Sequence, residues 1–344
     1  MKAMHELFVD EKIVASAMSS YDSTPDERYF FKNNFKGWGG NRIVFVFDAI
    51  RKAVRKDVVI IGHINLATVG YLIKLLKPSV KIVLIIHGIE AWSTQTSFKK
   101  KLLEKADVIL AVSHFTKQQV LLYNPFISEE KITVFPNTID PYFEMPADFE
   151  KPAYLQRRYG FDEQTKTILT VTRLFATEKY KGYDSILYVL KDVCKVVPNV
   201  RYLLMGKADE REQARIQLLI TQLDLSENVL MGGFIPENEL IDHYLLADTF
   251  VMPSKKEGFG IVFIEAMICG RHVIAGHKDG SRDALMEGEF GTLIDPDNLE
   301  NLKAEIVNIL NAPAIDEKAL QEKVYKQFGF PVFKERLLTI LDRN

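Results

Sequence analysis

The chain has 344 residues, more than one ordinary hydrophobic core holds, so two domains are expected. Hydrophobic residues make up 47% and charged residues 26%, which is typical of a globular protein, and no stretch reaches the roughly 18 apolar residues that a transmembrane helix needs. The formal net charge is −2, so the protein has no overall positive charge that would attract nucleic acid.

The N-terminus and the cysteines bear on the cellular compartment. Residues 1–13 lack the long apolar core of a signal peptide. Cys194 and Cys269 lie far apart, fit no metal-ligand spacing and fall in apolar helical stretches, so we expect buried, reduced thiols. These features favour a cytoplasmic protein.

Short apolar runs alternate with helical stretches along the first half of the chain. Residues 1–9, 67–76 and 98–105 have helical patterns. The expected strands are 57–62, 81–88, 107–112 and 131–137. These runs are continuously apolar rather than alternating, which indicates strands buried on both faces of a parallel sheet.

The second half repeats this pattern after residues 137–152, which contain three prolines and read as a linker. The expected strands are 167–173, 200–206, 228–233, 248–254, 271–276 and 291–295, and an amphipathic helix is expected at 332–341. The pattern predicts two doubly wound α/β domains, over residues 1–150 and 151–330. Residues 331–344 form a terminal helix, for which a return to the first domain is one option.

The segment 254–276 contains the residues that point most clearly to a ligand-binding site. A strand ends before the turn Glu257–Gly260, and a helix then begins at Ile261 and stops at Gly270. Two glycines before a helix let backbone N–H groups approach a ligand, and the helix dipole favours an anion such as phosphate there. Carboxylates beside an anion site are better suited to hydroxyl groups of a sugar and a ribose, which fits Glu257 and Glu265.

The order of these residues resembles a known signature. The run EGFGIVFIEAMICG, with Glu257 and Glu265 separated by seven residues, is similar to the motif of retaining glycosyltransferases of the family 4 type (glycosyl transferases group 1). The resemblance implies the GT-B fold, in which two Rossmann-like domains face each other across a cleft. It also implies that Glu257 lies near the donor sugar and that Glu265 holds the ribose. The donor-binding residues expected on this basis are Arg173, Lys181, Gly206, Glu257, Gly258, Phe259, Gly260, Ile261 and Glu265.

A second cluster agrees with the first. Arg173 ends the first strand of the second domain, and Lys181 precedes the next helix. A planar guanidinium and a compact ammonium suit the oxygens of a diphosphate, and fixed cations there stabilise the charge on a departing nucleoside diphosphate. The resemblance implies this role for both residues. Lys179 is a nearby competitor, but Lys181 precedes the Gly-x-Asp of the family pattern.

Polar residues that follow strands of the first domain are candidates for the reacting centre. His87 follows a strand and resembles the family's histidine near the reacting carbon. The catalytic candidates are therefore His87, Glu257, Arg173 and Lys181. The candidates for the acceptor pocket are His63, Asn65 and Glu90.

The start of the chain departs from the family pattern. A first domain of this type begins with a strand and a glycine-rich loop, whereas residues 1–9 already read as a helix. Residues 37–40 (Gly-Trp-Gly-Gly) come later and are also consistent with an ordinary turn. A missing first strand would leave an exposed sheet edge, so reduced turnover or a homo-oligomer that covers this edge is expected.

The resemblance, together with these residues, implies a retaining, metal-independent glycosyltransferase without a cofactor, which moves a sugar from a UDP- or GDP-sugar to a glycan or lipid-linked acceptor. Asp295-Pro-Asp297 resembles the metal-binding Asp-x-Asp of another transferase fold, but a proline-centred turn explains it. The basic faces 51–56 and 99–105 leave two options open: a solvated surface, and peripheral contact with anionic lipid at the inner membrane face. The functional alternatives are a non-catalytic or weakly active nucleotide-sugar binding protein, and another GT-B enzyme such as a nucleotide-sugar epimerase or a phosphorylase.

Overall fold

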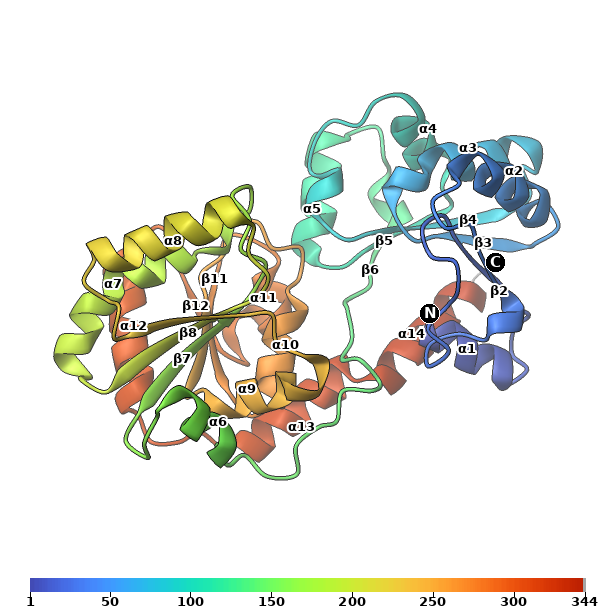
Figure 1. The fold of residues 1–344 in the computed structure, drawn as a ribbon. Helices are drawn as coiled ribbons and strands as arrows, with labels where there is room; N and C mark the ends of the chain where they lie inside the picture. Colours follow the sequence, from blue (N-terminus) through green and yellow to red (C-terminus); the bar gives the residue numbers. More distant parts are fainter. Residues whose placement is uncertain (343–344) are drawn as a thin grey trace. The chain divides into compact units, whose positions relative to one another are not determined.

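The structure, a computed structural model, describes residues 1–342 and divides into two compact units. Unit 1 consists of Met1–Pro141 together with the segment that begins at Gly329, and unit 2 is Tyr142–Phe328. In both units, strands alternate with helices around a parallel sheet (Figure 1). The predicted pair of α/β units is therefore present.

Unit 1 contains a four-stranded parallel sheet in the order β3-β4-β5-β6. Its strands are β3 (Val58–Ile61), β4 (Lys81–Ile86), β5 (Val108–Ala111) and β6 (Ile132–Val134). Its helices are α1 (Lys2–Val9), α2 (Arg42–Ala53), α3 (Ala67–Leu76), α4 (Ser97–Lys105), α5 (His114–Tyr123) and α14 (Phe330–Asp342). The four strands predicted for this half are confirmed, each slightly shorter than its apolar run.

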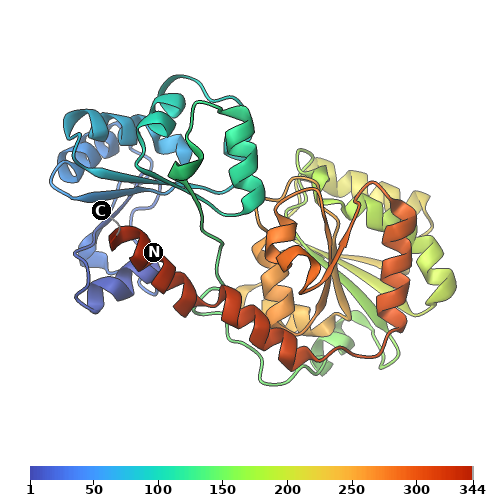
Figure 2. The same ribbon diagram turned by 180° about the vertical axis from the view of Figure 1, so that it is seen from behind.

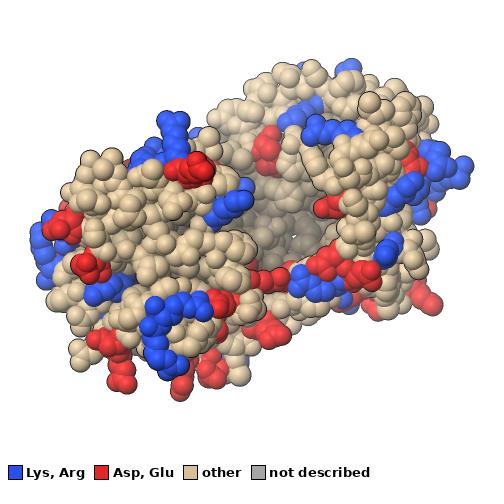
Figure 3. Space-filling view, viewed as in Figure 1, with Lys and Arg blue, Asp and Glu red and all other residues tan. Residues whose placement is uncertain are grey.

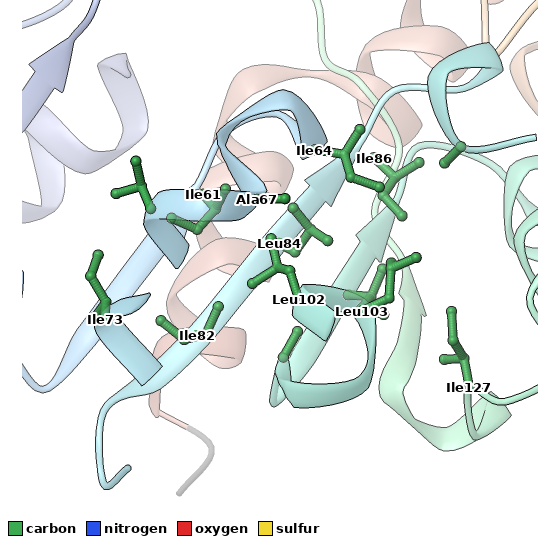
Figure 4. Close-up of a cluster of buried hydrophobic side chains, with 14 of the residues drawn as sticks. Ile61, Ile64, Ala67, Ile73, Ile82, Leu84, Ile86, Leu102, Leu103 and Ile127 are labelled. Carbon is green, nitrogen blue, oxygen red and sulfur yellow. The ribbon is translucent and has the colours of Figure 1, made fainter. Parts of the chain in front are cut away.

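Successive residues of β4 fill the cores on the two faces of this sheet. Ile82, Leu84 and Ile86 pack into the cluster that also contains Leu102 of α4 (Figure 4). Val83, between them, belongs to a second cluster with residues of α1 and α14. Because neighbouring residues of a strand point to opposite faces, a strand that is apolar throughout must be covered on both faces.

Helix α14 lies beside α1 in unit 1 (Figures 1 and 2). The ammonium of Lys334 in α14 lies 2.9 Å from a carboxylate oxygen of Glu6 in α1. The helix begins at Phe330 rather than at the expected Val332. Pro331 is tolerated because the first turn of a helix does not use its backbone N–H groups.

A strand, a glycine-containing loop and a helix do occur in this order in unit 1, but the strand lies outside the main sheet. β1 (Ala17–Ser19) and β2 (Phe35–Gly37) form a separate two-stranded parallel sheet. The chain passes from β2 through residues 37–40 into α2, whose first turn is capped by the Asn41 side chain. Gly37 is needed here, since a Cβ would lie 1.9 Å from the carbonyl oxygen of Asp22. Gly37 ends β2 and residues 39–40 form a turn before α2, so the alternative of a turn is correct for the part that follows the strand.

Unit 2 contains a six-stranded parallel sheet in the order β12-β11-β10-β7-β8-β9. Its strands are β7 (Lys166–Val171), β8 (Val200–Met205), β9 (Val229–Gly233), β10 (Thr249–Met252), β11 (His272–Gly276) and β12 (Thr292–Ile294). Its helices are α6 (Ala153–Tyr159), α7 (Tyr183–Val196), α8 (Glu210–Gln222), α9 (Leu240–Leu246), α10 (Ile261–Ile268), α11 (Ser281–Ala284), α12 (Leu299–Asn311) and α13 (Glu317–Phe328). The strand order reverses between β7 and β10, and sheets of this kind bind ligands at the carboxyl ends of the strands beside such a switch point.

Both faces of the unit 2 sheet are covered by helices (Figures 1 and 2). The ring of Phe250 lies 5.9 Å from that of Tyr244 in α9 and 5.9 Å from that of Phe263 in α10. The next residue, Val251, packs into the cluster under α7, α8 and α12 on the other face. The strands of the second half are therefore continuously apolar for the same reason as those of the first: both of their faces are buried.

The two cysteines differ in burial. Cys269 is buried at the end of α10, and burial raises the pKa of its thiol. Cys194 in α7 is only partly buried. The expectation of two buried thiols is therefore correct for Cys269 alone.

On the face of the molecule shown in Figure 3, acidic and basic side chains are interspersed rather than segregated by sign, in keeping with the net charge of −2. Among residues 1–342, every helix is too short or too polar to cross a membrane.

Candidate active site

The turns that follow β7 and β10 lie against each other at the switch point of unit 2. The backbone N–H of Lys255 donates to the carbonyl oxygen of Tyr180 at 2.9 Å. Gly182 has a φ of +84°, and a Cβ on it would lie 2.3 Å from the carbonyl oxygen of Pro253. Only glycine permits this approach, which brings Lys181 against the end of β10.

Lys181 and Glu257 form an ion pair where the two turns meet. Their side chains are only 14% and 16% exposed. Charges withdrawn from water to this degree are tolerated when they are paired and hydrogen-bonded. The pair presents a cation and a carboxylate side by side, so this place can hold an anionic group and a hydroxyl group of one ligand.

Phe259 anchors the turn that precedes α10. Its side chain is 1% exposed, and its ring meets that of Phe328 edge-on with 5.4 Å between centroids. Gly260 follows with a φ of +86° and opens α10. Residues 258–260 are predicted to bind the donor. Because the side chain of Phe259 is buried, only its backbone can contact a ligand. Ile261, at the first position of α10, is 42% exposed.

Asp279 is a buried carboxyl group under the Glu257 turn, and sequence reasoning did not single it out. It accepts hydrogen bonds from the Ser254 hydroxyl (2.7 Å) and from the backbone N–H groups of Glu257 (2.7 Å) and Ser281 (3.0 Å). Burial raises the pKa of Asp279 to about 6, although these hydrogen bonds act in the opposite direction. The carboxylate fixes the backbone from which the Glu257 side chain projects.

Arg173 follows β7, and its side chain is 64% exposed. Its guanidinium lies 2.8 Å from a carboxylate oxygen of Glu178. The other carboxylate oxygen of Glu178 is buried and has no hydrogen-bond partner among residues 1–342. Each predicted phosphate-binding cation is thus balanced by its own carboxylate. Glu178 was missed because it lies in a loop with several other charged residues.

Glu265 lies in the second turn of α10 and accepts a hydrogen bond of 2.8 Å from the hydroxyl group of Tyr244. Burial, followed by the negative charge of Glu265, raises the pKa of Tyr244 well above its usual value. Tyr244 therefore remains a hydrogen-bond donor and orients the carboxylate. Sequence reasoning missed this pair because 21 positions separate its members.

Gly206 follows β8 with a φ of +134°, and a Cβ on it would lie 1.7 Å from the carbonyl oxygen of Thr172. Glycine is required at this position because the ends of β7 and β8 are too close to leave room for a side chain. The neighbouring Asp209 caps α8 and also accepts a hydrogen bond from the backbone N–H of Ala176 at 3.0 Å. Direct contact of Gly206 with a donor remains a prediction.

The four predicted residues of unit 1 lie together at the carboxyl ends of β3 and β4. The rings of His63 and His87 are stacked, with 6.0 Å between centroids and 24° between planes. Nε2 of His87 lies 2.8 Å from the carbonyl oxygen of Gly62, and its backbone N–H donates to Glu90 at 2.6 Å. Nδ1 of His63 accepts from the backbone N–H of Asn65 at 3.0 Å. Since a carbonyl oxygen only accepts, neutral His87 carries its proton on Nε2, which makes Nδ1 an acceptor.

Asp295 and Asp297 form a turn bound by lysines. The Asp295 side chain accepts from the backbone N–H of Asp297 at 2.9 Å. Lys278 lies 2.6 Å from Asp295 and 2.7 Å from Asp297. Hydrogen bonds from Lys255 and Lys278 lower the pKa of Asp297 to about 2. Within residues 1–342, His, Cys, Asp and Glu side chains form no group of three or more that could hold a metal ion.

Two family models match the chain. Residues 154–327, half of the chain, match the model described as "Glycosyl transferases group 1". Residues 13–143 match the model described as "Glycosyltransferase Family 4". The first range contains all the unit 2 residues of the site, and the second contains the histidine cluster of unit 1.

Named relatives include the "GDP-mannose-dependent alpha-(1-6)-phosphatidylinositol monomannoside mannosyltransferase" of Mycolicibacterium smegmatis, 27% identical over 68% of this chain and 62% of that protein. The "D-inositol 3-phosphate glycosyltransferase" of Segniliparus rotundus is 31% identical over 54% of this chain and 40% of that protein. The chain thus spans less than two thirds of the length of these two relatives.

The crystal structure of Anabaena HepE in complex with UDP and glucose is similar in fold. It matches with a TM-score of 0.77 at 17% identity, over 96% of this chain and 100% of that chain. This likeness agrees with the GT-B fold of two Rossmann-like units.

Proposed function

The chain belongs to the glycosyl transferases of group 1, and we propose that it transfers a sugar from a nucleotide diphosphate sugar to a glycan or lipid-linked acceptor. We further propose that the reaction retains the configuration of the sugar and needs neither a metal ion nor a cofactor. The single observation that carries the proposal is the ion pair of Lys181 and Glu257 at the switch point of the unit 2 sheet.

The donor is assigned to the groups gathered at this switch point. Lys181 and Arg173 bind the diphosphate, Glu257 accepts a hydrogen bond from a hydroxyl of the sugar, and Glu265 does so from the ribose. Each of these carboxylates is ion-paired or hydrogen-bonded in the structure, so little reorganisation is needed to present it. The backbone amides of residues 258–260 lie before the N-terminus of α10, where partial positive charge favours the phosphates.

Departure of the nucleoside diphosphate is the step that the two cations assist. Negative charge builds on the leaving oxygen as its bond to the sugar breaks, and fixed positive charges stabilise that transition state. Arg173 and Lys181 supply this charge from the protein itself, which supports the proposed independence from metal ions. Asp295 and Asp297 are engaged by lysines, so they are poor candidates for holding a cation.

We assign the acceptor and the reacting centre of the sugar to the His63–His87 cluster of unit 1. His87 can accept a hydrogen bond through Nδ1, because Nε2 is engaged by a carbonyl oxygen. Glu90 holds the backbone of His87, and Asn65 holds the ring of His63. His87 is the catalytic residue of this cluster, whereas His63, Asn65 and Glu90 serve the acceptor.

The nucleotide of the donor is UDP or GDP. The HepE structure was determined with UDP and glucose, and the mycobacterial relative is named as GDP-mannose-dependent. The same relative is named for a phosphatidylinositol acceptor, which favours the lipid-linked alternative for this chain.

Peripheral membrane contact in the cytoplasm is proposed for the basic face of α4. The ammonium of Lys100 lies 5.0 Å from the ring centroid of Phe126, and that of Lys101 lies 5.5 Å from that of Phe98. Both rings are more than a third exposed, at 37% for Phe126 and 42% for Phe98. Exposed aromatic rings beside lysines suit the headgroup region of an anionic bilayer. Homo-oligomerisation also remains a prediction, which light scattering of the purified chain tests.

The test of the proposed function is an assay of the purified chain with UDP-glucose or GDP-mannose as donor and phosphatidylinositol as acceptor, with and without EDTA. We expect one nucleoside diphosphate to appear together with a glycosylated acceptor, at an unchanged rate in EDTA. NMR of the product reports its anomeric configuration.

Each alternative gives a different result in this assay. Donor binding without turnover, seen as a thermal shift alone, would indicate a binding protein. A changed sugar on an intact nucleotide would indicate an epimerase. Loss of activity in EDTA, restored by a divalent cation, would contradict the metal-independent mechanism.

A further inference from the structure

Two adjoining cavities open at the C-terminal end of α2 in unit 1, with volumes of about 230 and 310 Å³. Ser16 and Lys52 line both of them. We call this place the α2 pocket and define it by Ser16, Lys36, Arg51, Lys52, Arg55 and Lys56. Arg55 precedes the amino end of β3, whereas His63 follows its carboxyl end, so the pocket and the histidine cluster lie at opposite edges of the sheet.

The α2 pocket contains five cations, three of which contact the buried carboxylate of Asp48. Asp48 lies 2.8 Å from the ammonium of Lys36, 2.7 Å from the guanidinium of Arg51 and 3.8 Å from the ammonium of Lys52. Hydrogen bonds from Lys36 and Arg51 lower the pKa of Asp48 to about 2. One negative charge therefore meets three positive ones, and Arg55 and Lys56 add two further positive charges to the lining. Among the described residues that line the two cavities there is no Asp or Glu, since Asp48 itself lies outside both linings.

This arrangement differs from an ordinary basic helix surface, which is convex and lets its side chains spread into water. Residues 15–17 and 33–36 form walls beside α2, and Asp48 draws three cations to one point. Like charges about 4 Å apart repel by roughly 1 kcal/mol in water and by more where water is partly excluded. An anion in the pocket would relieve this repulsion.

We infer that the α2 pocket binds a phosphate group, as a monoester or diester, on a ligand other than the sugar donor. The groups that would meet the phosphate are donors: the Arg51 and Arg55 guanidinium forks, the lysine ammonium groups and the Ser16 hydroxyl. The position of Lys36 is further fixed by the ring of Trp38, 4.8 Å away. This inference does not depend on the proposed sugar transfer, because the pocket shares no residue with that site.

The same chemistry can come from a soluble phosphorylated metabolite or from the headgroup of a phospholipid, so the experiment has two arms. In the first, calorimetry measures binding of sn-glycerol 3-phosphate to the full chain. In the second, the chain is sedimented with phosphatidylcholine vesicles, with and without phosphatidylglycerol. Backbone amide shifts of the wild-type chain show which residues respond, and those of 15–17 and 51–56 are expected to move.

The decisive variant reverses two charges of the pocket, Lys52→Glu with Arg55→Glu. The matched control makes the same change of charge on the exposed surface of α7, Lys191→Glu with Lys195→Glu. We expect the pocket variant to bind at least tenfold more weakly and the control to bind like the wild type. Lys52→Gln with Arg55→Gln is the milder second variant if circular dichroism shows that the first is misfolded.

The two arms of the experiment distinguish a soluble ligand from a lipid headgroup. Binding of sn-glycerol 3-phosphate alone supports the pocket with a soluble ligand. Sedimentation that requires phosphatidylglycerol and is weakened in the pocket variant supports it with a lipid headgroup, because sedimentation through α4 would survive that variant. The inference is overturned if the wild type binds in neither arm, or if the pocket variants bind as well as the wild type. It is also overturned if Lys181→Ala abolishes phosphate binding, because the phosphate would then occupy the donor site.

Discussion

Lys181 and Glu257 form an ion pair although they are 76 positions apart, and this pair joins the turn before α7 to the turn before α10. Neither side chain can be removed without leaving its partner charged and largely shielded from water. The proposed donor site therefore depends on the packing of the two turns as much as on the two residue types.

Lys181→Ala is expected to lower kcat/KM for sugar transfer by about 10²–10³, because it removes a fixed cation from the developing charge of the leaving group. Lys179→Ala is the matched control, since Lys179 is an exposed neighbour in the same turn. Thermal unfolding is measured alongside the kinetics to separate lost catalysis from lost folding. Equal activity of the two variants would remove Lys181 from the mechanism.

Combining Lys181→Ala with Glu257→Gln tests whether the two residues act as one unit. Because each stabilises the charge of the other, their effects on the free energy of unfolding should not add. We expect the double variant to be more stable than the sum of the single changes predicts, by about 0.5–3 kcal/mol. Urea denaturation of the four proteins measures this coupling, and strict additivity would show that the pair contributes nothing to the fold.

The residues of the site differ in how far the sequence could identify them. The strands and the Glu257 turn were predictable because buried parallel strands are continuous apolar runs and glycine marks the turn between a strand and a helix. Asp279 and Tyr244 were missed because each acts through a partner more than 20 positions away. Strand β2 was missed for a different reason: its three residues include a lysine and a glycine, and it lies outside the main sheet.

Tyr244→Phe removes the hydroxyl group that orients Glu265 and leaves the ring that packs against Phe250. We expect KM for the donor to rise several-fold while kcat changes little, because Glu265 is assigned to the ribose rather than to the reacting bond. The loss of one hydrogen bond to a charged group should lower stability by about 1.5–3 kcal/mol. A fall in kcat with unchanged KM would contradict this division of roles.

Asp279 makes stability depend on pH in a direction opposite to that of most carboxyl groups. Its pKa is raised from 3.8 to about 6 by burial, so between these values the folded chain binds a proton that the unfolded chain has lost. The stabilisation by this proton is complete below about pH 4 and is lost as the pH rises through 6, an effect of roughly 3 kcal/mol.

Urea denaturation between pH 4 and pH 7 measures this effect, with Asp279→Asn as the reference because asparagine does not titrate. As the pH rises from 4 to 7, the unfolding free energy of the wild type should fall relative to that of the variant. A difference that does not change with pH would show that Asp279 keeps an ordinary pKa.

Gly182→Ala tests whether the approach of the two turns matters for function. Gly182 and Gly160 both have positive φ, of +84° and +68°, so alanine strains the backbone at either position. A Cβ at Gly160 meets nothing within 4 Å, whereas one at Gly182 lies 2.3 Å from the carbonyl oxygen of Pro253. Backbone strain alone costs about 1–3 kcal/mol, and Gly160→Ala should show only that loss of stability, with normal transfer. Gly182→Ala must in addition push the Lys181 turn away from β10. It should lower kcat/KM at least tenfold at a temperature where both variants are folded, and equal kinetics would show that the site tolerates separation of its two turns.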